Sequence, residues 1–235
     1  MNLYLWIYPL NNMEKELYIK HLTDNINNNF DKYQSYLDSR DLYSFCSLKT
    51  LINENIHCLL LNNHIASICV TNHILERFVK LSIIEHGTAG LNYSNDELYN
   101  TALLESYNFD DKVLSKTLLQ LKNIGLITDI EYNHLDNFRD NYRNPYSHSD
   151  TKNIIQDPST IKGRMYSIED FKNITNKIEL ENIQYEEKTI STFSPAMAQL
   201  SIQEHAIDNA FNYFKEVFNI MIIVDKRLQV LNSNK

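Results

Sequence analysis

The chain has 235 residues, of which 43% are hydrophobic and 22% charged, a balance typical of a packed globular protein and not of a disordered one. Its 30 acidic and 22 basic residues give a formal net charge of -8, which excludes general electrostatic attraction to nucleic acid, so any nucleic-acid site must be local. Cys46, Cys58 and Cys69 form no CxxC pair, which argues against a disulfide framework and against a zinc knuckle.

The segment 1–10 is apolar and aromatic, but it lacks the pattern of a targeting or membrane-spanning sequence. It has no basic residues before the apolar stretch, it is too short to cross a bilayer, and Pro9 interrupts it. We therefore expect a cytoplasmic protein with no membrane partner.

The chain contains only four glycines and four prolines, and apolar residues recur between them at spacings of three and four. This pattern predicts an all-α protein. A first helix is expected over residues 13–37. The helical pattern resumes over residues 42–86, with an interruption at Asn62 and Asn63, and Gly87 contributes to the stop.

Polar capping residues mark the helices that follow. Ser94 is a typical N-cap, and another helix is expected over residues 110–125, where a glycine ends it. Thr128 with Glu131 three residues later forms the pattern of a capping box. The helix that this box opens is predicted to run over residues 129–149.

The composition of the sequence changes after this helix. Residues 150–194 look like an insertion, in which the polar stretch 178–190 predicts loops and residues 167–177 a short helix. Pro195 then opens a last helix, which is expected to end near Leu231 and to be long enough to span the whole body.

Residues 139–150, with the sequence RDNYRNPYSHSD, gather cationic, imidazole, amide and hydroxyl side chains on one short piece of helix. Asn144 and His148 are four residues apart and share a face, and Arg143 lies in the neighbouring row. Pro145 lacks an N–H and strains the preceding turn, so the helix should bend or be partly unwound there.

The chemistry that needs this set of side chains is transesterification of RNA. A histidine with a pKa near the ordinary value of about 6.5 can take the proton of the 2′-OH or protonate the departing 5′-oxygen, and an arginine can hold the phosphate. The reaction requires no metal and no other cofactor. Because His148 cannot be acid and base at once, a two-fold dimer would supply two of each group.

The string Arg143-Asn144-x-x-x-His148 resembles the Arg-Asn motif of the HEPN superfamily, which is found in bacterial toxins, abortive-infection proteins and RNA-targeting CRISPR effectors. Residues 73–80 are similar to the early helix of that family, with an acidic and a basic residue four apart, and residues 195–231 are similar to its closing helix.

The resemblance implies a HEPN-like bundle of four to five core helices, with extra N-terminal helices and an insertion before the last helix. The bundle would take up residues 59–231 and include the insertion 150–194. Residues 1–58 would form a helical extension packed on this core, and residues 232–235 a tail. The resemblance leaves the extension and the insertion unexplained.

The same resemblance implies a metal-independent endoribonuclease that leaves a 2′,3′-cyclic phosphate and acts as a homodimer in a toxin-antitoxin or phage-defence setting. Arg143 and His148 carry over as the catalytic pair at the dimer interface, and Asn144 as the residue that positions them. Its partners would be the RNA substrate and an antitoxin or defence-system protein. Some HEPN toxins have a tyrosine two residues after the histidine, which a partner nucleotidyltransferase modifies; here that position is Asp150, so neutralisation by that route is not expected.

Four residues carry over more weakly, as support for the site. Two belong to the motif, Tyr146 and Ser147, and two to the early helix, Glu76 and Lys80. The simpler interpretation of Glu76 and Lys80 is an exposed ion pair one turn apart on a helix.

Two other functional hypotheses remain open from the sequence. A non-catalytic helical module could use Arg143 and His148 to grip RNA, a nucleotide or a partner protein, and a structural dimerisation domain would not use them at all. The motif would then be an ordinary polar helix end. No metal site is expected, because no carboxylate lies at metal-binding spacing from the other histidines: His57, His64, His73 and His86. His134 and His205 are expected to be surface or structural residues.

Overall fold

The computed structural model describes six stretches of the chain: residues 15–37, 42–91, 96–109, 111–155, 159–165 and 186–233. These stretches are mostly helical, as the all-α prediction requires. In the described part of the chain, no helix is long and apolar enough to cross a membrane. The apolar segment 1–10 and the short helix expected over residues 167–177 lie outside the described residues.

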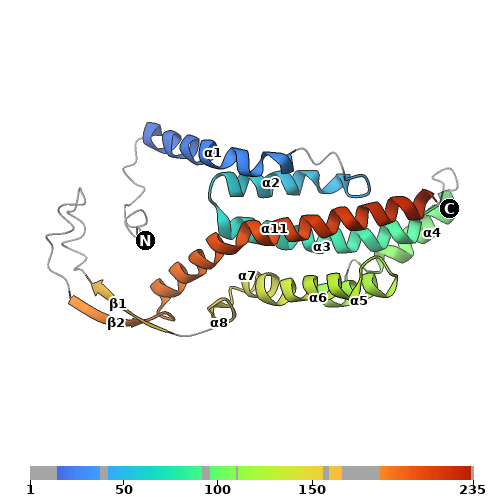
Figure 1. Ribbon diagram of the computed structural model, residues 1–235. Helices are drawn as coiled ribbons and strands as arrows, with labels where there is room; N and C mark the ends of the chain where they lie inside the picture. Colours follow the sequence, from blue (N-terminus) through green and yellow to red (C-terminus); the bar gives the residue numbers. More distant parts are fainter. Residues whose placement is uncertain are drawn as a thin grey trace.

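The first layer is a pair of antiparallel helices, α1 (Lys15–Leu37) and α2 (Lys49–Leu60), with the short 3-10 helix η3 (Cys46–Leu48) just before α2 (Figure 1). A tight turn separates α2 from α3 (His64–Thr88), and Asn62 in this turn has a φ of 59°. Asparagine tolerates this left-handed conformation better than most residues. The interruption predicted at Asn62 and Asn63 is therefore confirmed.

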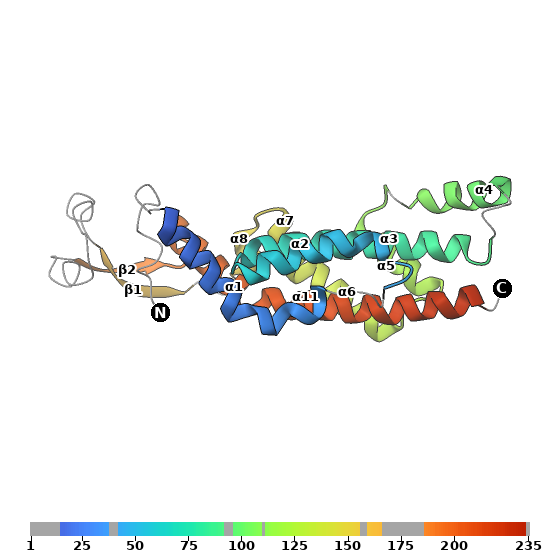
Figure 2. The same cartoon turned by 90° about the horizontal axis from the view of Figure 1, so that it is seen from above.

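The centre of the molecule is formed by α3 and α11 (Pro195–Ser233), which run in the same direction and pack along each other (Figures 1 and 2). The 39 residues of α11 give a length of about 58 Å at ~1.5 Å per residue, so this helix contacts elements at both ends of the bundle. A buried hydrogen bond joins the two helices, because the Tyr213 hydroxyl donates to Asn72 Oδ1 at 2.9 Å.

A third row of shorter helices runs back along α3, opposite in direction to it (Figure 1). In chain order this row consists of α4 (Asp96–Tyr107), α5 (Leu114–Asn123), α6 (Asp129–Phe138), η4 (Arg139–Arg143), α7 (Asn144–Ser147) and α8 (Thr151–Ile154). The row carries the Arg143–His148 motif past the first turns of α3, and this places the motif against the centre of the bundle.

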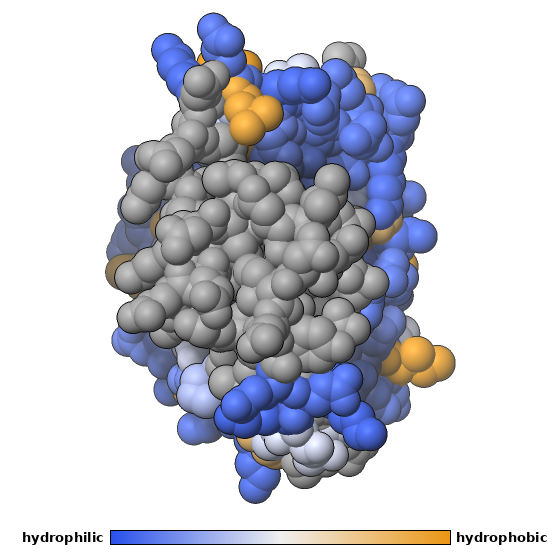
Figure 3. All heavy atoms as spheres, turned by 90° about the vertical axis from the view of Figure 1, so that its left-hand side faces the viewer, coloured by the Kyte–Doolittle hydropathy of each residue, from blue (hydrophilic) through white to orange (hydrophobic). Residues whose placement is uncertain are grey.

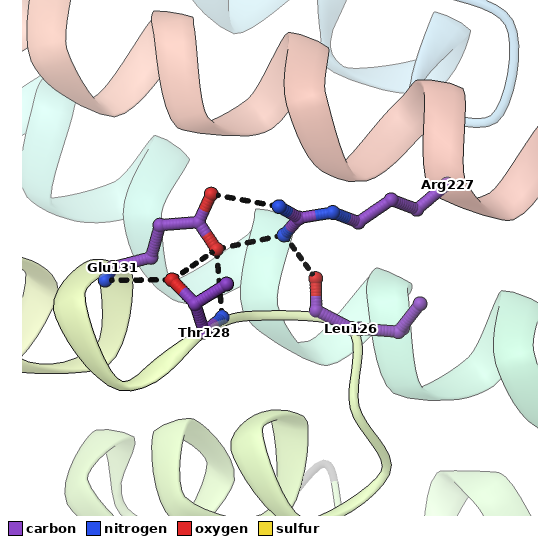
Figure 4. A network of polar contacts seen from close by, with 4 residues as sticks. All are labelled: Leu126, Thr128, Glu131 and Arg227. Carbon is purple, nitrogen blue, oxygen red and sulfur yellow. Dashed lines mark hydrogen bonds and ion pairs between the residues drawn. The ribbon is translucent and has the colours of Figure 1, made fainter.

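The predicted capping box at the start of α6 is confirmed, and α11 closes over it (Figure 4). The Glu131 N–H donates to Thr128 Oγ1 at 3.2 Å, and the Thr128 N–H donates to Glu131 Oε2 at 2.7 Å. Arg227 of α11 donates to both Glu131 oxygens, at 2.7 and 3.0 Å, and to the Leu126 carbonyl at 2.8 Å. The local cap thus becomes a long-range contact between α6 and α11.

The N-terminal helix α1 shares the aromatic core of α11. The Tyr33 ring meets Phe211 edge-on with centroids 4.9 Å apart, and Tyr36 lies 5.4 Å from Phe214 and 5.3 Å from Phe218. Such edge-to-face pairs add to the stabilisation that comes from area burial. Residues 15–37 therefore pack against the same helix as the motif row does.

A buried carboxylate ties the segment before α2 to the far end of α11. Asp225 is fully buried and accepts backbone hydrogen bonds from Tyr43 at 3.1 Å and from Ser44 at 2.7 Å. Gln229, one turn later, donates to the same carboxylate at 2.6 Å. Three donors offset the desolvation of this charge, which would otherwise be costly.

The predicted loops over residues 178–190 are wrong for residues 186–190, which form one strand of an antiparallel pair, and residues 178–185 lie outside the described residues. The strands of this hairpin are β1 (Thr160–Met165) and β2 (Glu186–Ser191), with Thr160 opposite Ser191. In β2 only Ile190 is apolar, and in β1 the apolar face is interrupted by Gly163, so neither strand shows the continuous apolar alternation that reveals a half-buried strand. Figure 3 shows the described surface at this end of the molecule as mostly hydrophilic, with only small separate apolar areas.

Candidate functional site

The helix that carries the motif changes its hydrogen-bond pattern just before Pro145. After α6 ends at Phe138, η4 forms a π-turn, in which the Asn144 N–H donates to the Arg139 carbonyl five residues back. Pro145 has no N–H to give to the Asn141 carbonyl, and its ring crowds that carbonyl, so a wider turn relieves the conflict. The expected distortion is present as a π-turn, and α7 continues the helix beyond it.

The guanidinium of Arg143 is held on two sides. Its Nε donates to Glu76 Oε1 of α3 at 2.7 Å, and its Nη1 donates to Asn144 Oδ1 at 3.3 Å. The side chains of Arg143 and Glu76 are each 28% exposed, so solvent screens this ion pair only in part. The structure therefore brings Glu76 directly to the motif, although 67 residues separate the two in sequence. Lys80, the other weakly assigned residue of α3, is half-buried one turn further on.

A chain of alternating charges extends from this pair along η4. Asn144 Nδ2 donates to Asp140 Oδ1 at 3.3 Å, and Arg139 Nη2 lies 3.1 Å from the same oxygen. The Nε of Arg139 donates to Asp136 at 2.8 Å. Both arginines of the motif helix thus have carboxylate partners. The site therefore has little excess positive charge, and these partners hold the guanidinium groups in fixed positions.

The end of α7 presents Ser147 and His148 to solvent. The His148 N–H donates to the Asn144 carbonyl at 3.1 Å, which keeps the histidine on the last turn of the helix. Ser149 then adopts a φ of 51°, and the Asp150 N–H donates to a carbonyl of α7, so the chain turns sharply away. Within the described ranges, the His148 imidazole makes no hydrogen bond or ion pair, and both ring nitrogens remain open to a ligand.

Tyr146 points away from this surface and anchors the motif to α11. Its hydroxyl lies 2.8 Å from His205 Nδ1. One turn earlier, the Tyr142 hydroxyl donates to Asn209 Oδ1 at 3.1 Å, and the Tyr142 ring stacks on Tyr213 with centroids 4.6 Å apart. Two residues of the motif helix, which are four residues apart, therefore contact two residues of α11 that are also four residues apart. Tyr146 has the position of an anchor and not of a group that touches substrate.

Burial shifts the pKa values of the groups in this anchor. It raises the pKa of Tyr146 well above the ordinary value for tyrosine, and it also raises the pKa of Tyr142. It lowers the pKa of His205, an effect that the nearby Asp208 carboxylate opposes. A neutral His205 can accept a hydrogen bond from the Tyr146 hydroxyl at Nδ1, in the tautomer that carries its own proton on Nε2. The structural role expected for His205 agrees with this contact, and the matching four-residue spacings are the signal that could have revealed its partner.

The geometry leaves one set of groups facing solvent at the motif: the guanidinium of Arg143, the amide of Asn144, the hydroxyl of Ser147 and the imidazole of His148. Such a set can bind a phosphate and exchange a proton with it. In the described stretches, no three His, Cys, Asp or Glu side chains lie close enough together to hold a metal ion. Comparison of the chain with protein-family models, with curated proteins and with solved structures found no match.

Proposed function

We propose that this protein is a metal-independent endoribonuclease of the HEPN type, acting in a toxin-antitoxin or phage-defence setting. The observation that carries the proposal is the turn on which Arg143, Asn144 and His148 meet, with Arg143 fixed from α3 by Glu76. A guanidinium that is oriented before substrate binds is the arrangement that stabilises charge developing on a phosphate.

In the reaction, the 2′-oxygen of the RNA attacks the adjacent phosphorus, and the bond from phosphorus to the 5′-oxygen breaks. His148 exchanges a proton with one of these oxygens, and Arg143 donates hydrogen bonds to the non-bridging oxygens as their charge grows. Asn144 holds the guanidinium from the side opposite Glu76. The products are a 2′,3′-cyclic phosphate and a 5′-hydroxyl.

The charge distribution favours a selective enzyme. The net charge is -8 and the motif arginines are paired with carboxylates, so phosphate attraction alone supplies little affinity. The substrate would then be recognised by shape, as in an RNA loop whose bases are already unstacked. A homodimer and an antitoxin or defence-system partner remain part of this proposal.

The bundle is compatible with a HEPN-like arrangement, in which α3 is the early helix, α6 to α7 the motif helix and α11 the closing helix. Support comes from the way α3 and α11 both contact the motif helix, through Glu76 and through His205. The helices before α3 would be an addition to this core, and the hairpin would be part of the insertion.

The test is an in vitro cleavage assay with total cellular RNA in the presence of EDTA. Wild-type protein is expected to produce discrete fragments ending in 2′,3′-cyclic phosphate, and Arg143→Ala and His148→Ala are expected to lose at least about 100-fold in rate. His57→Ala is the matched control, because His57 is an exposed histidine on a different helix. Cleavage that appears only after a divalent metal is added would exclude this mechanism.

The pairing of Arg143 with Glu76 also supports a second candidate, a binding module that grips RNA without cutting it. An arginine that is oriented by a carboxylate can hold a phosphate group whether or not a bond is then broken, so this ion pair does not by itself require catalysis. The same assay separates the two candidates. Saturable RNA binding that is lost in Arg143→Ala, with the RNA recovered intact from wild-type protein, would establish the binding module.

A further inference from the structure

The contacts between α3 and the motif helix fix how the two elements align. Glu76 meets Arg143, while Cys69, seven residues earlier on α3, lies close enough to Tyr146 to add to the effect of burial in raising the pKa of that tyrosine. The helices therefore run in opposite directions, and the first turns of α3 lie beside α7 (Figures 1 and 2). Moving from Glu76 toward the start of α3 leads from Arg143 toward Ser147 and His148.

His73 lies on this part of α3. It is three residues before Glu76 and four after Cys69, so the three side chains are neighbours on one face of the helix. Its neighbours Asn72 and Ile74 are buried, whereas His73 is exposed. Among the residues that the structure describes, His73 makes no hydrogen bond or ion pair.

We propose that His73 is a second catalytic imidazole, which acts with His148 on the same RNA phosphate across the seam between α3 and α7. This inference rests on the proposed ribonuclease function and deepens it. Each chain then carries a base and an acid of its own, whereas the motif by itself supplies a single histidine. Arg143 lies one turn further along the same seam, where Glu76 orients its guanidinium, and it donates hydrogen bonds to the phosphate.

The proton balance is complete with these two groups. One imidazole, in its neutral form, takes the 2′-OH proton as the 2′-oxygen bonds to phosphorus. The other, in its protonated form, gives a proton to the 5′-oxygen as the bond from phosphorus to that oxygen breaks. No oxidant, reductant or further reactant is needed. The cleavage rate should then depend on one group that must be deprotonated and one that must be protonated, which gives a bell-shaped dependence on pH.

The first test compares His73→Ala with wild type and with His57→Ala over the pH range 4.5 to 9. The His73 variant is expected to lose about 100-fold or more in cleavage rate, to lose one limb of the bell, and to recover activity when imidazole is added to the buffer. Circular dichroism and thermal melting should be unchanged, because His73 is exposed. A His73 variant that cleaves at the wild-type rate, or that keeps both limbs of the bell, overturns the inference.

The second test asks whether both histidines act within one chain. His73→Ala and His148→Ala chains are co-expressed with different affinity tags, and any mixed assembly is purified through both tags. We expect the mixture to remain inactive, since neither chain has a complete pair; restored cleavage would place the two histidines on different chains and overturn the single-chain site. Failure of the ribonuclease proposal has a different signature, namely wild-type protein that does not cleave RNA at all.

Discussion

At the scale of single residues, the decisive contact is the ion pair between Glu76 and Arg143. The simplest account of Glu76, an exposed partner for Lys80 on its own helix, leaves out its hydrogen bond to the motif. A partly buried guanidinium that has a fixed partner loses less conformational freedom when it binds a phosphate than one that moves freely in solvent. The position of Glu76 on α3 therefore gives the motif part of its rigidity.

A double-mutant cycle on this pair should measure the free energy of interaction between the two side chains. Glu76→Gln and Arg143→Gln are each expected to lower the free energy of unfolding, and their coupling energy should be about 1 kcal/mol, because the pair is only partly screened by solvent. Urea denaturation of the two single variants and the double variant gives this value. As a control, Glu76→Gln combined with Lys226→Gln, an exposed residue near the far end of α11, should be additive.

At the scale of elements, the π-turn decides where the motif side chains point. A π-turn inserts one residue relative to a continuous α-helix, so it rotates everything that follows by about 100°. With the turn in place, Tyr142 and Tyr146 both face α11, where they meet Asn209 and His205. Pro145 accounts for the distortion, and the contacts with α11 account for the orientation of the helix beyond it.

The other element-scale contact is the one between Arg227 and the capping box of α6. Arg227→Gln should lower the free energy of unfolding by about 1–2 kcal/mol, because it breaks charge-assisted bonds to Glu131 and the bond to the Leu126 carbonyl. Lys226→Gln, at the exposed neighbouring position, should have little effect. Equal losses in both variants would mean that the network in Figure 4 does not stabilise the fold.

This contact should also appear in the pH dependence of stability. Burial acts to raise the pKa of Glu131, but hydrogen bonds from Arg227 and from Thr128 outweigh it and lower the pKa below its ordinary value. The resulting stabilisation is present above the unfolded-state pKa of about 4.3 and is lost as the pH falls through the folded-state value. In Arg227→Gln, urea midpoints measured between pH 6 and pH 3 should fall less steeply than in wild type.

At the scale of the whole molecule, the hairpin is separable from the helical bundle. Its two strands pair with each other, and hydrogen bonds between Ser159 and Thr192 close its base. The segment before it belongs to the bundle instead, because Ile154 of α8 is buried in the core. The insertion expected over residues 150–194 thus contains both a core helix and a projecting hairpin.

Excising residues 160–191 and joining Ser159 to Thr192 tests this division. The helical bundle should keep its melting temperature within a few degrees, since β2 is exposed along almost all of its length. If the hairpin is a specificity element of the proposed ribonuclease, the pattern of RNA fragments should change while the rate per site stays similar. An unfolded product would show that the hairpin supports the bundle, and an unchanged pattern would exclude a role in specificity.

Much of the fold could be predicted from the sequence, because its helices are marked by local signals. The break at Asn62 and Asn63 and the capping box at Thr128 each depend on residues within one turn of each other. The motif could be located for the same reason, since its side chains are contiguous. The hairpin was missed because β2 is almost entirely polar, because Gly163 interrupts the apolar face of β1, and because each strand pairs with a partner more than twenty residues away in sequence.

The sequence by itself determined the helical class, the main helix breaks and the segment proposed to carry the chemistry, because spacing and capping act over three or four residues. Only the tertiary structure decided which groups meet that segment. Glu76 reaches Arg143 across 67 residues, and His205 reaches Tyr146 across 59. Such pairings depend on how whole helices pack, and the packing is set by the summed burial of many apolar side chains and not by any short pattern.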